Sequence, residues 1–339
     1  MILAGLLLTA ALASSCTKIR TMPDTTPQEI AMKNPVMTKA AGEWEGPFGL
    51  FAYSTSAQSG TDWTSVWAGS SPYLDNVAFK KQGENWLGWD PTSQAHHAYY
   101  YPLSGSLLFA GYSPHQTQSD GTITGVELIP NGDNNNPYFR IEFTHLVTDK
   151  KADMNNMPDL MWFDVKDANS GKTVAKTSEA INVTFRHALS KVTFKFLDSQ
   201  DYYKLKSVAI KDCIYESVFY SGNTAGWMPD ISALADYELQ IQPETVLNDW
   251  QSDELFFIPQ YLDGVFPVLG SGSLDSGVDV ILSFTVTDGF GEQTVELPLK
   301  DYTPRWEMGK HYHYNVTVNA DPIDFGAPSI SITQQVVSM

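Results

Sequence analysis

Apolar and polar residues alternate with a period of two through much of the second half of the chain. Between 181 and 185 the apolar residues occupy odd positions, and between 192 and 196 they occupy even positions. Side chains in a strand point alternately to its two faces, so this pattern predicts one long strand with a bulge or kink near Ser190 or Lys191.

A second alternating pair of runs lies nearer the C-terminus. Even positions from Val278 to Val286 are apolar, a turn sequence follows at 288–291, and odd positions from Val295 to Leu299 are apolar again. This pattern predicts a β-hairpin. Pro298 has no N–H to donate to a neighbouring strand, which predicts that the second strand of the hairpin lies at a sheet edge.

The first half of the chain holds short apolar runs separated by turn residues, and helical periodicity is scarce throughout. Such spacing is typical of sandwiches and barrels, so the predicted fold class is all-β. The candidate strands are Phe48 to Tyr53, Val77 to Lys80, His97 to Tyr101, Leu107 to Tyr112, Phe139 to Thr144 and Leu160 to Val165.

A length of 339 residues is enough for two β-sandwich domains. A polar loop at 166–172 marks a weak boundary between them. The predicted segments are a signal peptide at 1–15, a tether or propeptide with room for one short strand at 16–43, an N-terminal sandwich at 44–175 and a C-terminal sandwich at 176–339.

The N-terminus carries an apolar run that ends at a cysteine. Ile2 to Ala13 is too short to span a bilayer as a helix, but it suits the core of a signal peptide. Small residues directly precede Cys16, which resembles a bacterial lipobox and makes Cys16 the candidate lipidation site. The alternative is a plain signal peptide with an incidental cysteine.

Charge and cysteine content narrow the function. The formal net charge is −18 and only 18% of residues are charged. Nucleic-acid binding needs clustered Lys and Arg, so the sequence predicts no nucleic-acid partner. After Cys16 only Cys213 remains, in a strand-like run, which predicts a buried apolar residue and no intrachain disulfide.

Two groups of residues that contain histidine are candidate catalytic or metal sites. His187, Ser190 and Lys191 are close in sequence, but residues three apart on a strand point to opposite faces, which disfavours a nucleophile and base pair. His311 and His313 share a strand face, yet a zinc site needs further ligands, with His96, His97 or a carboxylate as candidates. The prediction is therefore no catalytic site, no metal and no cofactor.

Two other features have ordinary structural explanations. The loop from Asp133 to Asn136 lacks the spaced acidic positions of a calcium loop and is interpreted as a solvated turn. Nine tryptophans could form a sugar-binding platform, but most of them, including Trp86, Trp89 and Trp162, lie in strand-like runs and are predicted to be core residues.

An ordered set of short motifs runs along the chain, and the most specific is Phe-Arg-His-Ala-Leu-Ser-Lys from Phe185 to Lys191. The others are Phe48 to Tyr53, Tyr73 to Val77, Tyr99 to Pro102, Leu107 to Pro114, Asp159 to Met161, Phe257 to Gln260, and Trp306 with Gly309, Tyr312 and Tyr314. Together these motifs resemble the fimbrillin family of Gram-negative type V pili.

The resemblance implies a structural protein and not an enzyme. It implies two tandem transthyretin-like, Greek-key β-sandwich domains, export as a lipoprotein held to outer-membrane lipid through Cys16, and a place in a fimbrium at the cell surface. It further implies trimming by a Lys/Arg-specific surface protease and assembly with other pilin subunits for cell adhesion. In such an assembly, loss of the first strand opens a groove that a neighbour's C-terminal strand fills.

The resemblance also suggests processing and donor residues. Met37 to Ala40 is similar to the family's Thr-Arg-Ala stretch, so Lys39 and Ala40 flank the predicted cut; Lys33 is an alternative, as is an uncleaved tether. The C-terminal tail alternates, which makes it a candidate donor strand through Ile330, Ile332 and Val336. A monomeric surface adhesin or glycan-binding lipoprotein that never polymerises is the alternative function.

Overall fold

The protein is all-β, as predicted from the sequence. The computed structural model describes residues 26–36, 46–65, 72–129, 138–154, 157–198, 201–222, 225–267, 273–288, 291–319 and 329–338. Its only helical pieces within these ranges are short 3-10 turns. They are η1 (Trp63–Ser65), η2 (Gln116–Gln118), η5 (Val165–Asp167), η6 (Asn169–Gly171), η7 (Leu247–Asp249) and η8 (Leu299–Asp301).

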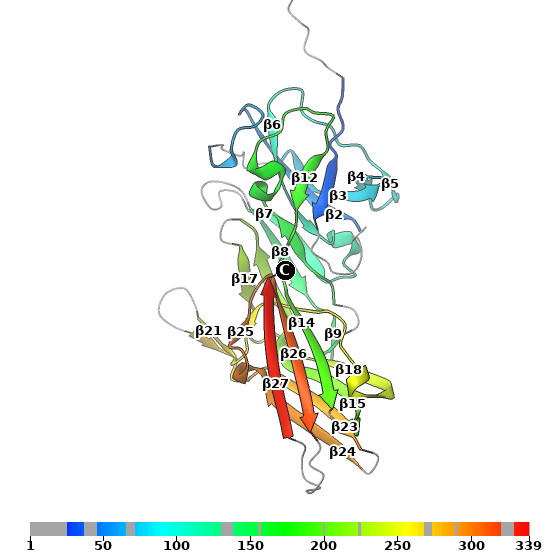
Figure 1. Ribbon diagram of the computed structural model, residues 1–339. Helices are drawn as coiled ribbons and strands as arrows, with labels where there is room; N and C mark the ends of the chain where they lie inside the picture. The colour runs from blue at the N-terminus through cyan, green and yellow to red at the C-terminus, as the bar shows by residue number, and fades with distance from the viewer. Residues whose placement is uncertain are drawn as a thin grey trace, which may run out of the picture.

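The N-terminal end is built on a sheet that closes on itself. Its order is β12-β1-β4-β3-β2-β6-β11-β13, and β12 and β13 are consecutive parts of one chain segment. We call this the closed sheet (Figure 1). Its strands are β1 (Met32–Val36), β2 (Phe48–Thr55), β3 (Leu74–Gln82), β4 (Asn85–Asp90), β6 (Ser106–Ser113), β11 (Met161–Phe163), β12 (Ile181–Thr184) and β13 (Arg186–His187), with β5 (Ala95–His96) paired to β4.

Strands β2 and β6 are buried on both faces, which explains their continuous apolar runs. Phe48 and Leu50 point into the core enclosed by the closed sheet. Phe51, on the other face of β2, stacks on Phe139 with ring centroids 5.4 Å apart. A second core therefore lies between the outer face of the closed sheet and the next sheet along the molecule.

That next sheet, the middle sheet, has the order β17-β16-β8-β7. Every second residue of β8 is buried, as its alternating sequence requires. Figure 1 shows β7, β8 and β17 between the closed sheet and the sheets at the opposite end of the molecule. The strands are β7 (Ile123–Ile129), β8 (Tyr138–Thr144), β16 (Glu216–Tyr220) and β17 (Gly226–Pro229).

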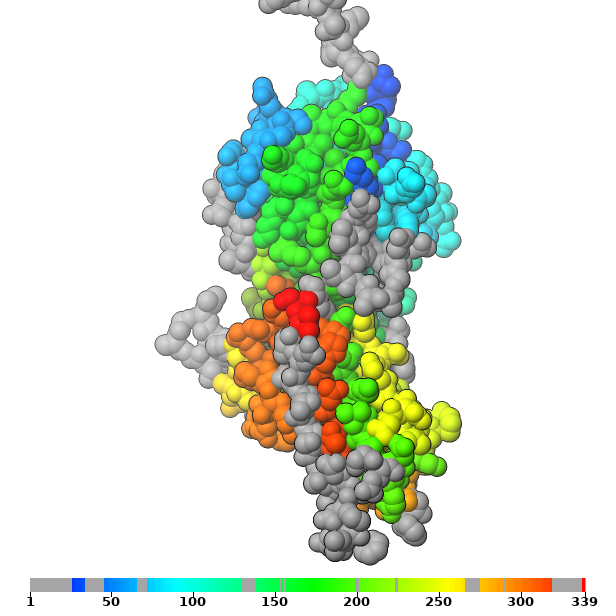
Figure 2. Space-filling model, in the orientation of Figure 1, coloured from blue at the N-terminus to red at the C-terminus, as the bar shows by residue number. Residues whose placement is uncertain are grey.

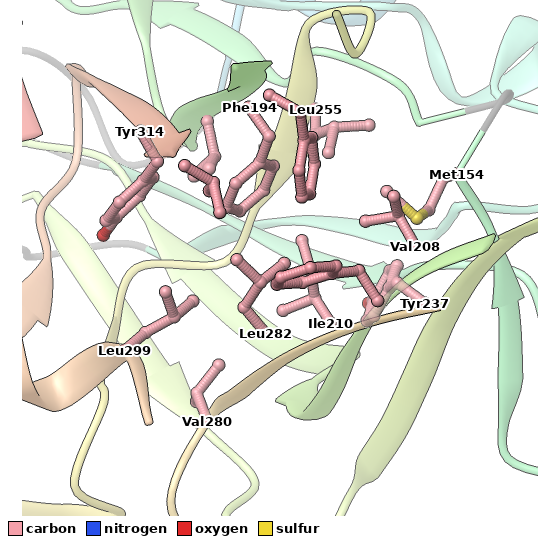
Figure 3. Packing of buried hydrophobic residues seen from close by; sticks show 14 of the residues in the cluster. Met154, Phe194, Val208, Ile210, Tyr237, Leu255, Val280, Leu282, Leu299 and Tyr314 are labelled. Atoms are coloured by element: carbon pink, nitrogen blue, oxygen red, sulfur yellow. The ribbon is translucent and has the colours of Figure 1, made fainter. Parts of the chain in front are cut away.

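The end of the molecule opposite the closed sheet is a sandwich of two sheets, one of six strands and one of four. We call the four-stranded one the terminal sheet. Phe194 and Tyr314 from the terminal sheet face Ile210 and Leu282 from the six-stranded sheet (Figure 3). The six-stranded order is β24 (Glu292–Pro298), β23 (Ile281–Thr287), β15 (Lys204–Ile214), β18 (Leu234–Val246), β10 (Lys151–Asp153) and β9 (Val147–Thr148). The terminal sheet runs β19 (Leu255–Phe257), β14 (Ser190–Asp198), β26 (Lys310–Asn319) and β27 (Ser329–Ser338).

Two small pairs complete the described strands, and the space-filling view shows an elongated molecule (Figure 2). The pairs are β20 (Gln260–Tyr261) with β25 (Arg305–Trp306), and β21 (Val265–Pro267) with β22 (Ser273–Asp275). The predicted hairpin is confirmed as β23 and β24, with β24 at the edge of its sheet. Cys213 is fully buried in the C-terminal core, as predicted.

The predicted long strand from 181 to 196 is in fact divided between two sheets. β12 and β13 pair within the closed sheet, whereas β14 pairs within the terminal sheet. Ala188 and Leu189, between them, are buried in the core beside the middle sheet. The change of alternation phase therefore marks the crossing from one sheet to another and not a bulge within one strand.

Sheet membership also crosses the predicted boundary at 175/176. Strands β12, β13 and β16 follow that boundary but pair with strands that precede it, and β10 precedes it but pairs with β18. The polar loop that suggested the boundary forms η5 and η6, and its Asp167 accepts a hydrogen bond from Arg186. Chain segments on each side of the predicted boundary thus contribute strands to sheets formed mainly by the other side. The transthyretin-like, Greek-key topology stays a prediction.

Candidate assembly site

The first described strand, β1, completes the closed sheet. It runs parallel to β12, with Met32 opposite Ile181, and antiparallel to β4, with Met32 opposite Trp86. In Figure 1 this N-terminal strand lies beside β12, although about 145 residues of sequence separate them. Among the described strands, β1 is therefore the one element that joins β4 to β12.

The residues just before β1 are also held by strand-like pairing. The Ile30 amide donates to the Tyr99 carbonyl at 2.7 Å, and the Tyr101 amide donates to the Gln28 carbonyl at 2.9 Å. Glu29 lies 2.6 Å from the Nε2 atom of His96. The backbone of the N-terminal segment is thus hydrogen-bonded both before β1 begins and within β1.

Two apolar side chains anchor this segment in the core. Ile30 and Met32 are both 0% exposed and pack in the cluster enclosed by the closed sheet. Burying each contributes about 1.5–3 kcal/mol. Loss of the segment would leave two apolar pockets at a spacing of two residues, along with the unpaired backbone edges of β4 and β12.

A glycine in β4 allows this arrangement. A Cβ atom on Gly88 would lie 2.0 Å from the His97 carbonyl oxygen and 2.5 Å from the Tyr99 ring. The segment 97–101 can therefore lie against β4 only because position 88 has no side chain, and this segment is the one that pairs with 28–30.

The predicted anchor and processing residues lie outside the described residues. Cys16 belongs to 1–25, and Lys39 and Ala40 belong to 37–45, the stretch between β1 and β2. A cut between 39 and 40 would separate β1 from every strand that follows it in the chain.

At the other terminus, β27 pairs antiparallel with β26 over ten residues and forms one edge of the terminal sheet. Its register sets the three predicted donor residues opposite buried residues of β26. The pairs are Ile330 with Val318, Ile332 with Val316, and Val336 with Tyr312. The side chains of 329–336 lie outside the description, so the register alone places these three residues on one phase of the strand.

The residues weighed for nucleophilic chemistry have separate partners. The His187 ring nitrogen Nδ1 lies 3.0 Å from Asp159 Oδ1, and the Ser190 hydroxyl donates to the Glu307 carbonyl. Lys191 forms an ion pair with Glu254 at 2.9 Å. These contacts bind β13 and β14 to neighbouring elements, since they join residues 28 to 117 positions apart.

The histidine pair of β26 is brought together. The His311 and His313 rings lie 3.6 Å apart, and both contact the Thr193 hydroxyl. In the part of the chain that the structure describes, no group of three or more His, Cys, Asp or Glu is placed to hold a metal. Likewise, none of its helices is long and apolar enough to cross a membrane.

His145 is a buried titratable residue that was not predicted from the sequence. His145 is 3% exposed, its Nδ1 lies 2.7 Å from the Tyr237 hydroxyl, and its Nε2 has no partner. Burial lowers the pKa of His145 to about 3, so the ring is neutral at pH 7. A signal existed: His145 continues the odd-numbered inward phase of Phe139, Ile141 and Phe143.

Comparison with known proteins defines the class. The family model described as fimbrillin-like matches residues 38–334, so this chain belongs to the fimbrillin-like family. No curated protein sequence matches the chain.

Solved structures with similar folds come from several bacteria. A "putative cell adhesion protein" from Bacteroides uniformis is 15% identical, with a TM-score of 0.52 over 92% of this chain and 98% of that one. Another with the same description, from Bacteroides ovatus, is 16% identical, with a TM-score of 0.48 over 92% and 96%. The tip fimbrial protein Mfa3 from Porphyromonas gingivalis is 10% identical, with a TM-score of 0.36 over 92% and 99%.

Proposed function

We propose that this chain is a structural pilus subunit that serves cell adhesion and is assembled by exchange of a terminal strand. In this proposal the chain is exported as a lipoprotein, is held to outer-membrane lipid through Cys16, and is cut between Lys39 and Ala40 by a Lys/Arg-specific surface protease. Its partners are other pilin subunits. Membership of the fimbrillin-like family supports this class of function.

The observation that carries the proposal is the position of β1. The strand is inserted between β4 and β12, its anchors Ile30 and Met32 are fully buried, and the predicted cut follows it directly. A strand of this kind leaves a gap with two free backbone edges when it departs, and such a gap accepts a strand from another chain by β-augmentation.

The properties of β27 suit the donor role. It is the last described strand, it is ten residues long, and it pairs with β26 at a sheet edge. Its departure therefore breaks no connection between the other described strands. The spacing of Ile330 and Ile332 equals that of Ile30 and Met32, whose pockets the donor would fill.

The pairing of β27 also favours the second candidate function. Because this strand completes the terminal sheet of its own chain, a protein that keeps it there and also keeps β1 is a stable monomer. That protein would be a surface adhesin or glycan-binding lipoprotein that does not polymerise.

Two variants separate the candidates in cells. The pilus proposal expects a mature N-terminus at Ala40 and multimers that resist SDS but dissociate on heating. It expects Lys39→Ala to remain an uncut monomer, with Lys33→Ala as the matched control that is still cut. Deleting 329–339 should give a cut, folded subunit that no longer polymerises. Multimers of that truncated protein would show that the donor strand lies elsewhere.

The anchor has its own test. Cys16→Ala should abolish acyl labelling and release the protein from the membrane fraction, because lipoprotein processing attaches the acyl chains at this residue. Equal labelling of the variant and the parent protein would contradict the lipoprotein assignment while leaving strand exchange untouched.

A further inference from the structure

A compact cluster of nitrogen-bearing side chains lies where β14 and β26 pair in the terminal sheet. Lys191 is directly opposite His311, and Thr193 is directly opposite His313. The two imidazole rings are 3.6 Å apart. The Thr193 hydroxyl lies 3.1 Å from His311 Nε2 and 2.9 Å from His313 Nδ1, so one hydroxyl serves both rings.

The charges around this cluster are balanced only while the rings are neutral. From β14 it is faced by Lys191, which is 4% exposed, and from the chain just before β19 by Glu254, its ion-pair partner. From β27 the opposite residues are Val337 and Gln335, neither of which titrates. One positive and one negative charge therefore face the two histidines, and each added proton leaves an excess positive charge.

The rings resist protonation. Burial, followed by the charges of Lys191 and His313, lowers the pKa of His311 to about 4, and Glu254 opposes them. Burial and then Lys191 lower the pKa of His313. As the pH falls below about 6.5, unfolded or opened chains take up these protons and the paired terminal sheet does not, so stability is lost progressively down to about pH 4.

β26 is the strand through which β27 is held. It pairs with β14 on one side and with β27 on the other, and β27 pairs with no other described strand. We propose that His311, His313 and Lys191 form an acid-sensitive clasp between β14 and β26, which holds β26, and through it β27, firmly at neutral pH and loosens the pairing of β26 with β14 at mildly acidic pH. This property concerns the single chain and holds whether or not β27 is exchanged between subunits.

Amide hydrogen exchange on the full-length monomer tests the clasp. After correction for intrinsic rates, the protection of 310–319, and with it that of 329–338, should fall between pH 7.5 and pH 5. Linkage for a pKa of about 4 against an ordinary 6.5 gives ~30-fold, which solvent screening of the part-exposed ring reduces to about tenfold. In the double variant His311→Gln with His313→Gln the protection should change by less than about twofold.

Two further measurements keep the test sharp. His97→Gln, an exposed histidine of the N-terminal half, is the matched control and should behave as the parent protein. In Lys191→Gln the NMR titration midpoints of His311 and His313 should move upward, because a neighbouring positive charge has been removed. Unchanged midpoints, or an acid-induced loss of protection that persists in the double histidine variant, would overturn the proposal.

Discussion

The two terminal strands are held in opposite ways. β1 lies between two neighbours and buries Ile30 and Met32 completely, whereas β27 lies at a sheet edge, paired on one side, with Val337 44% exposed. The N-terminal strand completes a closed sheet, and the C-terminal strand extends an open one. A strand paired on both sides and a strand paired on one side only are thus found in one chain.

The largest expected effect comes from placing a charge on a buried position of β1. Met32→Asp puts a carboxylate into the core of the closed sheet, where no partner awaits it, and should lower the free energy of unfolding by more than about 4 kcal/mol. Urea unfolding followed by tryptophan fluorescence measures this. A loss below about 1 kcal/mol would mean that β1 contributes little to the closed sheet.

The second effect appears on acidification and concerns the junction between the middle sheet and the C-terminal sandwich. His145 has a pKa of about 3 when folded and an ordinary value near 6.5 when unfolded, so stability is lost as the pH falls through this interval. At pH 5 the loss relative to pH 7 is about 2 kcal/mol. His145→Gln should abolish this part of the pH dependence, as read from urea midpoints at the two pH values.

A smaller change tests how well the β1 pockets are filled. Ile30→Val removes one methylene from a fully buried side chain and should cost about 1 kcal/mol of unfolding free energy. A loss close to zero would mean that the pocket around Ile30 is not tightly filled.

The smallest effect is expected at the opposite terminus. Val337→Asp introduces the same carboxylate into β27, but at a half-exposed edge position, and should change the unfolding free energy by less than about 0.5 kcal/mol. Compared with Met32→Asp, it measures the contrast between the two strands directly. Equal losses in the two variants would remove that contrast.

The sequence indicates most strands because their alternation is local. The hairpin of β23 and β24 and the edge position of Pro298 follow from residues within one stretch of about twenty. The pairing partners do not follow, because period two reports which side chains share a face and not which sheet that face belongs to. The segment 181–196 illustrates this: its change of phase was visible, but the two sheets it joins were not.

The candidate site was predictable only in part. The alternating tail suggested β27, and its register is consistent with one phase for Ile330, Ile332 and Val336. β1 gave little local signal, because two apolar residues in a Pro-spotted stretch resemble any tether. Its role depends on contacts with Trp86 and Ile181, which are about 50 and 150 residues away. The cut at Lys39 stays a prediction.

The route by which the sheet closes affects how the chain can fold while it emerges from the ribosome or crosses a membrane. The ring of strands ends on β12 and β13, so residues 181–187 must be present before β1 and β11 find their second partners, in addition to β4 and β6. Contacts this distant in sequence form slowly, and until they form, the strand edges stay open to other chains. An N-terminal portion that has not yet reached about residue 190 is therefore an incomplete unit that cannot close its sheet.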